Sequence, residues 1–378
     1  MNNKIKTNYP WLYDIPELVD DFLESLKKPE NNYSFFPAKK GLTHYGSTLD
    51  LGFSCYGLKL KHITNKYSNL NNDQKDSWIE YINSFQTSDS DYIKNLYIDP
   101  QYINAINNFN IRSSSKYMIK KLLTTLRIKE YETLDDFIMR SLRAETKQAI
   151  ATIEEAGYKS KFIYRDLIDN EGFIIEFLKN QNWRSPWMAG AQFANMSLFL
   201  SQLQDEIKED HIKDMVNFID ELCDPSTGAY FVNPKPSNRE LINGSMKVIS
   251  GLDWINRKIN YPEKLIDLCL NSNISHDGCD LVDVVYVLFK CSNQTAYKKS
   301  EIAKYIYDLL EIISLHFYQN EGGFSYFLGK SQTDYYGVKI TKGTNNPDIH
   351  GTLLLTWALS MIVQMLEIES INLNILKP

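Results

Sequence analysis

The chain has 378 residues, a formal net charge of −6 at neutral pH and a hydrophobic content of 43%. No block rich in lysine or arginine supplies the positive surface by which proteins bind nucleic acids, so a nucleic-acid partner is not expected. No long apolar run and no apolar leader segment is present, which predicts a cytoplasmic protein without a membrane span. The cysteines are odd in number and scattered, as is typical of a reducing compartment rather than a disulfide framework.

Helical periodicity dominates the chain, and two kinds of segment alternate along it. The first kind has one apolar and one polar face, which is typical of a helix at a protein surface. These amphipathic segments are residues 15–28, 73–85, 113–129, 211–222, 261–270 and 300–317. The second kind is nearly uncharged and predicts a helix that is buried on all sides. These apolar segments begin near Thr43, Arg143, Trp187, Leu241, His276 and Pro347.

The alternation is itself loosely repeated. An amphipathic helix, a turn with glycine and then an aromatic residue, and an apolar helix follow one another at 211–251 and again at 306–360. Such repetition indicates a helical array. A buried layer inside a half-exposed layer predicts that the array closes, because an open array would leave its inner helices wet. We therefore predict one all-α domain over residues 1–378, a double-layered (α/α)6 barrel in which residues 1–35 form a cap or lid.

Three motifs in the C-terminal half carry a resemblance to a known group of proteins. GGFSYF, DIHGTLLLTWAL and LVDVVYVLF resemble repeat units of the α/α-toroid superfamily, which includes class II terpene cyclases and the β-subunits of protein prenyltransferases. Six-hairpin polysaccharide lyases and glycoside hydrolases have a similar barrel. The resemblance implies an enzyme of terpene-cyclase or prenyltransferase kind that acts on an isoprenoid or polyene substrate. The DxDD motif of the cyclases is absent.

The same resemblance bears on a possible cofactor. In the prenyltransferases an Asp, a Cys and a His hold a zinc ion, and Asp283 and His350 match two of these ligands. The family's cysteine position is Val285 here, but Cys279 lies one helical turn before Asp283 and offers a third ligand of a type that zinc accepts. The resemblance therefore implies either no cofactor or a single Zn or Mg ion, held by Cys279, Asp283 and His350.

The apolar segment that begins at His276 carries one polar stripe. On a helix, His276, Cys279, Asp280 and Asp283 would share one face. Two carboxyl groups on one face can share a proton, which raises one pKa and suits general-acid catalysis. We predict Asp280 or Asp283 as the proton donor, with His276 and His350 as catalytic partners and His350 orienting the donor. The alternative is that these acids only cap the helix.

The starts of the buried helices are expected to meet at one end of the barrel. Free N–H groups and helix dipoles at such an end favour an anionic ligand, and aromatic side chains there could stack on sugars or stabilise carbocations. Arg143 has an alternative place in a surface network with Glu145 and Lys147. The predicted substrate-binding residues are His44, Tyr45, Asp50, Arg143, Trp187, Gln192, Asn243, Lys247, Tyr326 and Trp357.

Three functions remain open at this point, and they belong to different classes. The first is the cyclase or prenyltransferase kind of enzyme, against which the missing DxDD motif weighs. The second is a lyase or glycoside hydrolase that uses His44, His350 and tyrosines on acidic or neutral oligosaccharides. The third is a non-catalytic helical scaffold. The expected partner is a small molecule or an oligosaccharide, and the sequence indicates no oligomeric state.

Overall fold

The computed structural model describes residues 2–88, 94–108, 133–165, 173–203 and 207–378. Within these ranges the protein is mostly helical, with fifteen α-helices and six short strands that pair into three two-stranded hairpins. The predicted all-α class is confirmed at this level. The amphipathic helix expected at 113–129 lies outside the described residues.

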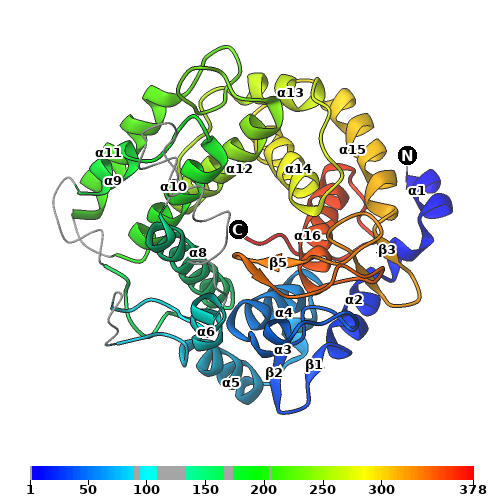
Figure 1. Ribbon diagram of the computed structural model, residues 1–378. Coiled ribbons are helices and arrows are strands. Elements are labelled where there is room, and N and C mark those ends of the chain that lie inside the picture. The colour runs from blue at the N-terminus through cyan, green and yellow to red at the C-terminus, as the bar shows by residue number, and fades with distance from the viewer. Residues whose placement is uncertain (1, 89–93, 109–132, 166–172, 204–206) are drawn as a thin grey trace.

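Six helices form a set that we call the inner helices. Each contacts the next one along the chain, and the last, α16, contacts the first, α4. Figure 1 shows these six around the middle of the molecule. Most of their side chains are buried, as the apolar segments predict, although in α8 only 11 of the 22 residues are. The inner helices are α4 (Leu51–Ile63), α8 (Leu134–Glu155), α10 (Pro186–Ser201), α12 (Asn238–Trp254), α14 (Gly278–Ser292) and α16 (Ile349–Met365).

The other helices are shorter or amphipathic, and Figure 1 shows most of them at the periphery. Most of the longer ones contact an inner helix; α15, for example, contacts α14 and α16 and buries Ile302, Ile306 and Leu310. They are α1 (Asn2–Asn8), α2 (Ile15–Glu24), α3 (His44–Thr48), α5 (Asn72–Asn83), α6 (Pro100–Asn108), α9 (Phe173–Lys179), α11 (Ile207–Leu222), α13 (Pro262–Leu270) and α15 (Lys299–Ser314).

The strands form short hairpins beside the helices. Two 3-10 helices, Pro10–Tyr13 and Lys66–Asn69, complete the described elements. The antiparallel pairs are β1 (Lys27–Lys28) with β2 (Asn31–Phe35), β3 (Phe317–Tyr318) with β4 (Gly323–Phe324), and β5 (Asp334–Tyr335) with β6 (Val338–Lys339).

The N-terminal residues, expected to be a cap or lid, include a helix that packs on an inner helix. Helix α2 contacts α4 and buries Val19, Phe22 and Leu23. The ammonium group of Lys61, on α4, lies 2.5 Å from a carboxylate oxygen of Asp20 and 2.7 Å from one of Glu24. These contacts join α2 to the side of α4.

The first apolar segment does not form one helix, because the chain is extended at Leu49 between α3 and α4. The cap of α4 comes from a distant residue. The carboxylate of Asp99 accepts hydrogen bonds from the backbone N–H groups of Asp50, at 2.7 Å, and Leu51, at 3.1 Å. Free N–H groups at a helix start need such an acceptor. The local pattern around residue 50 contains no sign of it.

Replacing Asp99 with Ala should therefore destabilise the protein by about 2–4 kcal/mol, because buried N–H groups at the start of α4 lose a charged acceptor. Urea unfolding measures this loss. Asp99→Asn keeps part of the acceptor capacity and should lose less. Equal stability of the Ala variant and the parent would contradict this role of Asp99.

The two ends of the inner helices are bridged differently. At their N-terminal ends, the peptide of Tyr326 joins α14 to α16: its carbonyl oxygen accepts from the N–H of Gly278 and its N–H donates to Asp348. At the other end, the C-terminal segment joins α4 to α12: the N–H of Asn374 donates to the carbonyl oxygen of Ile63, and Nε1 of Trp254 donates to an oxygen of Pro378. Figure 1 shows the C-terminus in the middle of the molecule.

In the described ranges, no helix combines the length and the apolar character that a membrane crossing requires. The apolar side chains of the inner and outer helices instead pack into one continuous core. Polar side chains on the inner helices are therefore exceptions, and buried polar side chains usually have a specific role.

Candidate functional site

Helix α14 starts two residues later than the sequence predicts. It begins at Gly278, and the side chain of Asp277 caps it by accepting a hydrogen bond from the N–H of Asp280. His276 precedes the helix and is exposed. The alternative of a capping acid therefore applies to Asp277, and the predicted position of His276 on the helix is wrong.

Asp280 is held by two side chains of α12. Its carboxylate accepts from Nε of Arg239 and from Nδ2 of Asn243, each at 2.6 Å. No hydrogen bond joins it to Asp283 in the described structure. The predicted carboxylate pair with a shared proton is therefore not formed. Asp280 and Asn243, predicted for catalysis and substrate binding, instead link α12 to α14.

Asp283, one turn further along α14, is different. Its side chain is 1% exposed, and its Oδ2 atom has no hydrogen-bond partner. Burial raises the pKa of this carboxyl group to about 7. The positive charge of Lys247 opposes this rise, and the negative charge of Asp280 adds to it. Near neutral pH the group therefore exists in both protonation states, as a general acid or base requires.

Asp283 interacts electrostatically with Lys247, Cys279 and Tyr326, and His350 stacks on the ring of Tyr326. We call these five predicted site residues the Asp283 cluster: Lys247, Cys279, Asp283, Tyr326 and His350. Burial raises the pKa of the Cys279 thiol to about 12, and the charge of Asp283 contributes. Burial also raises the pKa of Tyr326, and Cys279 adds to the shift. The cluster therefore joins α12, α14, α16 and the segment before α16.

His350 lies between two tyrosine rings. Its ring centroid is 4.8 Å from that of Tyr56 and 5.3 Å from that of Tyr326, and all three rings are stacked. Burial, followed by the charge of Lys247, lowers its pKa to about 3. The imidazole is thus neutral near neutral pH, and its Nδ1 atom has no hydrogen-bond partner. No hydrogen bond connects it to Asp283, so the orienting role stays a prediction.

The Asp283 cluster does not fit a metal ion. Among the described residues no three His, Cys, Asp or Glu side chains lie close enough together to hold one. Zinc binds the thiolate of cysteine, whereas the pKa of Cys279 is about 12. The ammonium group of Lys247 acts on Cys279, Asp283 and His350 alike and would repel a cation. The structure therefore does not assemble Cys279, Asp283 and His350 as a ligand set.

Lys247 also belongs to a group of three lysines on three inner helices, which we call the lysine group: Lys59 of α4, Lys147 of α8 and Lys247 of α12. All three are half-buried. Burial lowers the pKa of Lys59, and burial followed by the charges of Lys59 and Lys247 lowers the pKa of Lys147 well below its ordinary value. The charges of Lys59 and Lys247 therefore each act on the ammonium group of Lys147.

The sequence carries a signal for these lysines that is easy to overlook. Lys59 interrupts an otherwise apolar run in α4, and Lys247 interrupts the small-residue run of α12. A single charged residue on a buried helix has to face either the surface or a polar site. Lys147 was expected in a surface network, and Lys59 was not singled out at all.

That surface network of Arg143, Glu145 and Lys147 is not formed. Glu145 is 1% exposed and accepts a hydrogen bond of 2.9 Å from the hydroxyl group of Tyr335. Burial raises the pKa of Glu145 to about 8. The guanidinium group of Arg143 lies over the ring of Phe177, at 5.1 Å from its centroid.

The substrate-binding residues expected near α3 and α4 differ in their exposure and in their contacts. His44 is exposed, Tyr45 is half-buried, and their ring centroids are 5.4 Å apart. Asp50 accepts a hydrogen bond from the ammonium group of Lys28 at 2.8 Å, which makes it part of an ion pair. Of these three side chains, Asp50 is the one with a clear structural role.

The remaining predicted residues lie on α10 and α16. Trp187 is half-buried, and the guanidinium group of Arg239 lies 5.3 Å from its ring centroid. Gln192 and Trp357 are buried, and each has a polar atom without a hydrogen-bond partner, Oε1 and Nε1 respectively. Trp357 packs beside Tyr286 of α14, at 5.3 Å between ring centroids.

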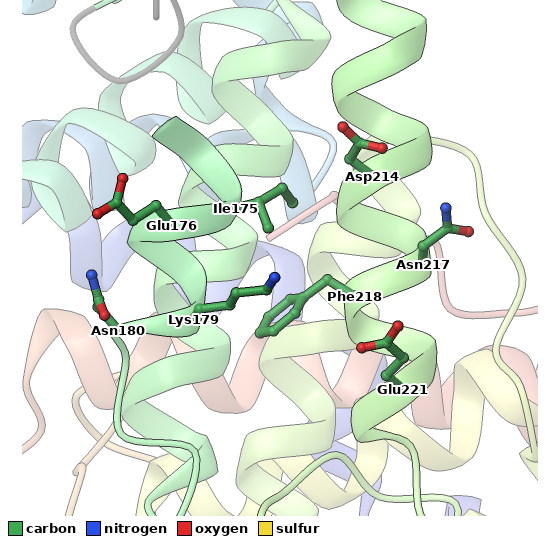
Figure 2. Close-up of a pocket in the computed structure, with 8 residues that line it drawn as sticks. All are labelled: Ile175, Glu176, Lys179, Asn180, Asp214, Asn217, Phe218 and Glu221. Atoms are coloured by element: carbon green, nitrogen blue, oxygen red, sulfur yellow. The ribbon is translucent and has the colours of Figure 1, made fainter. Parts of the chain in front are cut away.

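A surface pocket of about 610 Å³ lies elsewhere, between α9 and α11. Figure 2 shows Lys179 of α9 reaching toward Phe218 of α11, with Glu221 beside Phe218. Glu176 and Asp214 also line the pocket. None of the residues predicted for catalysis or binding lines this pocket. The surface pocket and the site residues predicted from the sequence therefore lie in different parts of the molecule.

Comparisons of the chain with models of known protein families, with curated proteins and with solved structures gave no match. The resemblance to the α/α-toroid superfamily consequently stands on its motifs alone. A proposal of function therefore has to rest on the side chains of the Asp283 cluster and the lysine group.

Proposed function

We propose that the protein is an enzyme built on a double-layered (α/α)6 barrel, in which Asp283 exchanges a proton with an anionic small molecule. The proposed architecture is supported by the contacts of the inner helices, which return from α16 to α4, and by the outer helices that cover them. An open array would leave two inner helices without a neighbour on one side.

The properties of Asp283 carry this proposal. A buried carboxyl group that receives no hydrogen bond and has a pKa of about 7 is poised to give up or accept a proton near neutral pH. Neutral His350 and the rings of Tyr56 and Tyr326 lie in the same region. A substrate next to Asp283 would therefore meet one proton-exchanging group, aromatic faces and the ammonium group of Lys247.

The first candidate reaction is acid-initiated cyclisation of an isoprenoid. Protonated Asp283 would give its proton to a carbon–carbon double bond, and the carbocation that forms would react with a second double bond of the same molecule. Loss of a proton from a neighbouring carbon then removes the carbocation and yields an isomer of the substrate with the same overall charge. Aromatic rings such as those of Tyr56 and Tyr326 can stabilise the passing positive charge.

The lysine group favours a second candidate, the elimination reaction of a uronate-containing saccharide. Ammonium groups would neutralise the sugar carboxylate and so acidify the adjacent C–H bond. Ionised Asp283 would then take that proton, a carbon–carbon double bond would form, and the glycosidic oxygen would leave as a hydroxyl group by taking up the proton from Asp283. This reaction uses Asp283 as a base, whereas cyclisation uses it as an acid.

The pH dependence should separate the two reactions, because they require opposite states of one carboxyl group. With a pKa of about 7, cyclisation should be fast below neutral pH and fall roughly tenfold for each unit above it. Elimination should rise through the same range and level off above it. We expect the cyclisation profile from geranylgeranyl diphosphate and the elimination profile from oligogalacturonides, with products followed by mass spectrometry.

A rate that does not change between about pH 6 and pH 8 would contradict a proton-exchanging role of Asp283. Absence of product from both substrate classes would instead support the third function, a non-catalytic scaffold. Both measurements use the purified full chain, and its folding at each pH is checked by circular dichroism.

A further inference from the structure

We propose that a second pocket, at the C-terminal ends of α14 and α16, binds an uncharged saccharide. This proposal goes beyond the proposed function, because no residue of the Asp283 cluster lines the pocket. Asp283 and His350 lie near the starts of α14 and α16, whereas the pocket is formed by the ends of these two helices, the start of α15 and the loop before it. Figure 1 shows the three helices next to one another.

The pocket combines apolar walls with a polar group that has no partner. Its volume is about 510 Å³, which is within the range of sites for small molecules. Phe289 and Ile302, both buried, and the half-buried Met365 form part of its walls. Ser292 also lines the pocket, and its Oγ atom is buried without a hydrogen-bond partner among the described residues. Because buried hydroxyl groups normally have partners, Ser292 indicates that a polar ligand group belongs here.

The loop between α14 and α15 is held in place from outside the pocket. The hydroxyl group of Thr295 donates to a carboxylate oxygen of Glu263 at 3.1 Å, and the hydroxyl group of Tyr297 donates to one of Asp267 at 3.2 Å. Both acids belong to α13, which lies on the other side of the loop from the pocket lining of α15 and α16. A ligand would therefore meet a loop that is already ordered, which lowers the entropy cost of binding.

The charged side chains of the lining neutralise each other. They are Lys299 and Glu367, and the ammonium group of the first lies 2.9 Å from a carboxylate oxygen of the second. A charged ligand would have to compete with this ion pair for either partner. An uncharged ligand can enter the pocket and leave the pair intact.

The other polar groups of the lining favour a ligand with many hydroxyl groups. Asn293, Gln294 and Gln364 present side-chain amides that make no hydrogen bond to another described residue. An amide both donates and accepts hydrogen bonds, and so do the hydroxyl group of Ser292 and each hydroxyl group of a sugar. The apolar face of a sugar ring can pack on a wall such as Phe289.

The same lining is less suited to a peptide. Peptides are commonly bound by pairing with a free strand edge or by placing apolar side chains in a hydrophobic groove. The lining residues belong to three helices and one loop, so they offer no strand edge, and amides and hydroxyl groups interrupt the apolar wall. A saccharide therefore matches the pocket better than a peptide does.

The neutral disaccharides maltose, cellobiose and lactose are the probes, and saturation-transfer NMR on the full chain is the readout. At least one of them should give a saturable signal, from which its dissociation constant follows. Gln364→Ala should weaken binding by about three- to tenfold, because one side-chain hydrogen bond is lost. Ala303→Phe, whose larger side chain would fill part of the pocket, should abolish the signal.

Ser292→Ala distinguishes a ligand contact from a structural role. It should weaken disaccharide binding by a similar factor, yet without ligand it should melt at the temperature of the parent or higher, because a buried hydroxyl group without a partner is removed. A lower melting temperature with unchanged disaccharide binding would count against the proposal. If Ala303→Phe does not fold, Ser292→Ala and Gln364→Ala still decide the test.

Gln101→Ala is the matched control, since Gln101 is an exposed glutamine of α6 outside the pocket, and it should bind as the parent does. Absence of a signal from all the disaccharides would overturn the proposal. So would binding that resists both Gln364→Ala and Ala303→Phe, which would place the sugar elsewhere, for example at Asp283. Tighter binding of glucuronate, glucosamine or a capped trialanine peptide than of the disaccharides would overturn the proposed ligand class.

Discussion

Asp283→Asn is expected to lower turnover by at least about 100-fold and to make the folded protein more stable near pH 8. The amide has nearly the shape of the carboxyl group but exchanges no proton. It also carries no charge, and Asp283 occupies a buried position where its charged form receives no hydrogen bond. Loss of function and gain of stability together are the signature of a strained catalytic group.

The stability part of this prediction follows from the pKa of Asp283. Its ordinary value is 3.8 and its value in the folded protein is about 7. The folded state therefore keeps the proton over a range in which the unfolded chain has released it. Stability from this group is fully present below the lower value and declines as pH rises to about 7. The difference between the two pKa values corresponds to a change of at most about 4 kcal/mol in the free energy of unfolding.

Urea unfolding of Asp283→Asn and the parent, near pH 4 and near pH 8, measures this difference. The two proteins should be similar at the lower pH, and the variant should be the more stable at the higher one. Glu145→Gln is the matched control for activity, because Glu145 is equally buried and also has a raised pKa but already accepts a hydrogen bond from Tyr335. Full turnover by Asp283→Asn would refute its catalytic role.

Asp348→Ala should show the largest loss of stability, about 3–5 kcal/mol. The buried carboxylate of Asp348 accepts hydrogen bonds from the backbone N–H groups of Tyr326 at 2.7 Å, Gln332 at 3.0 Å and Gly351 at 2.8 Å. It caps α16 and ties the preceding segment to it. Without this carboxylate, three backbone N–H groups lose their acceptor, and the one of Gly351 is buried.

The same substitution should also disturb the Asp283 cluster, because Asp348 positions the peptide of Tyr326, whose ring stacks on His350. Unfolding in urea measures the stability, and the NMR shifts of the His350 ring protons report the stacking. Asp334→Ala, at an exposed aspartate of the neighbouring β5, is the control and should change neither. If stability fell but the His350 signals stayed in place, Asp348 would be a helix cap without influence on the cluster.

The buried and half-exposed helices could be recognised from the sequence, because hydrophobic periodicity is a local property. An uncharged run such as that of α16 must be covered, and a striped run such as that of α15 has one face to cover. Their alternation placed Asp283 and His350 on buried helices. The break between α3 and α4 was missed, because the acceptor that caps α4, Asp99, lies far away in sequence.

The roles of individual side chains were decided by tertiary structure. Asp280 and Asp283 share one helical face in the sequence, yet of these two only Asp280 accepts hydrogen bonds from Arg239 and Asn243 of α12. A pKa depends on burial and on charges from other helices, so the raised value of Asp283 has no local signature. The lysine group could not be recognised from the sequence for the same reason, because its three members lie on helices that are distant in the chain.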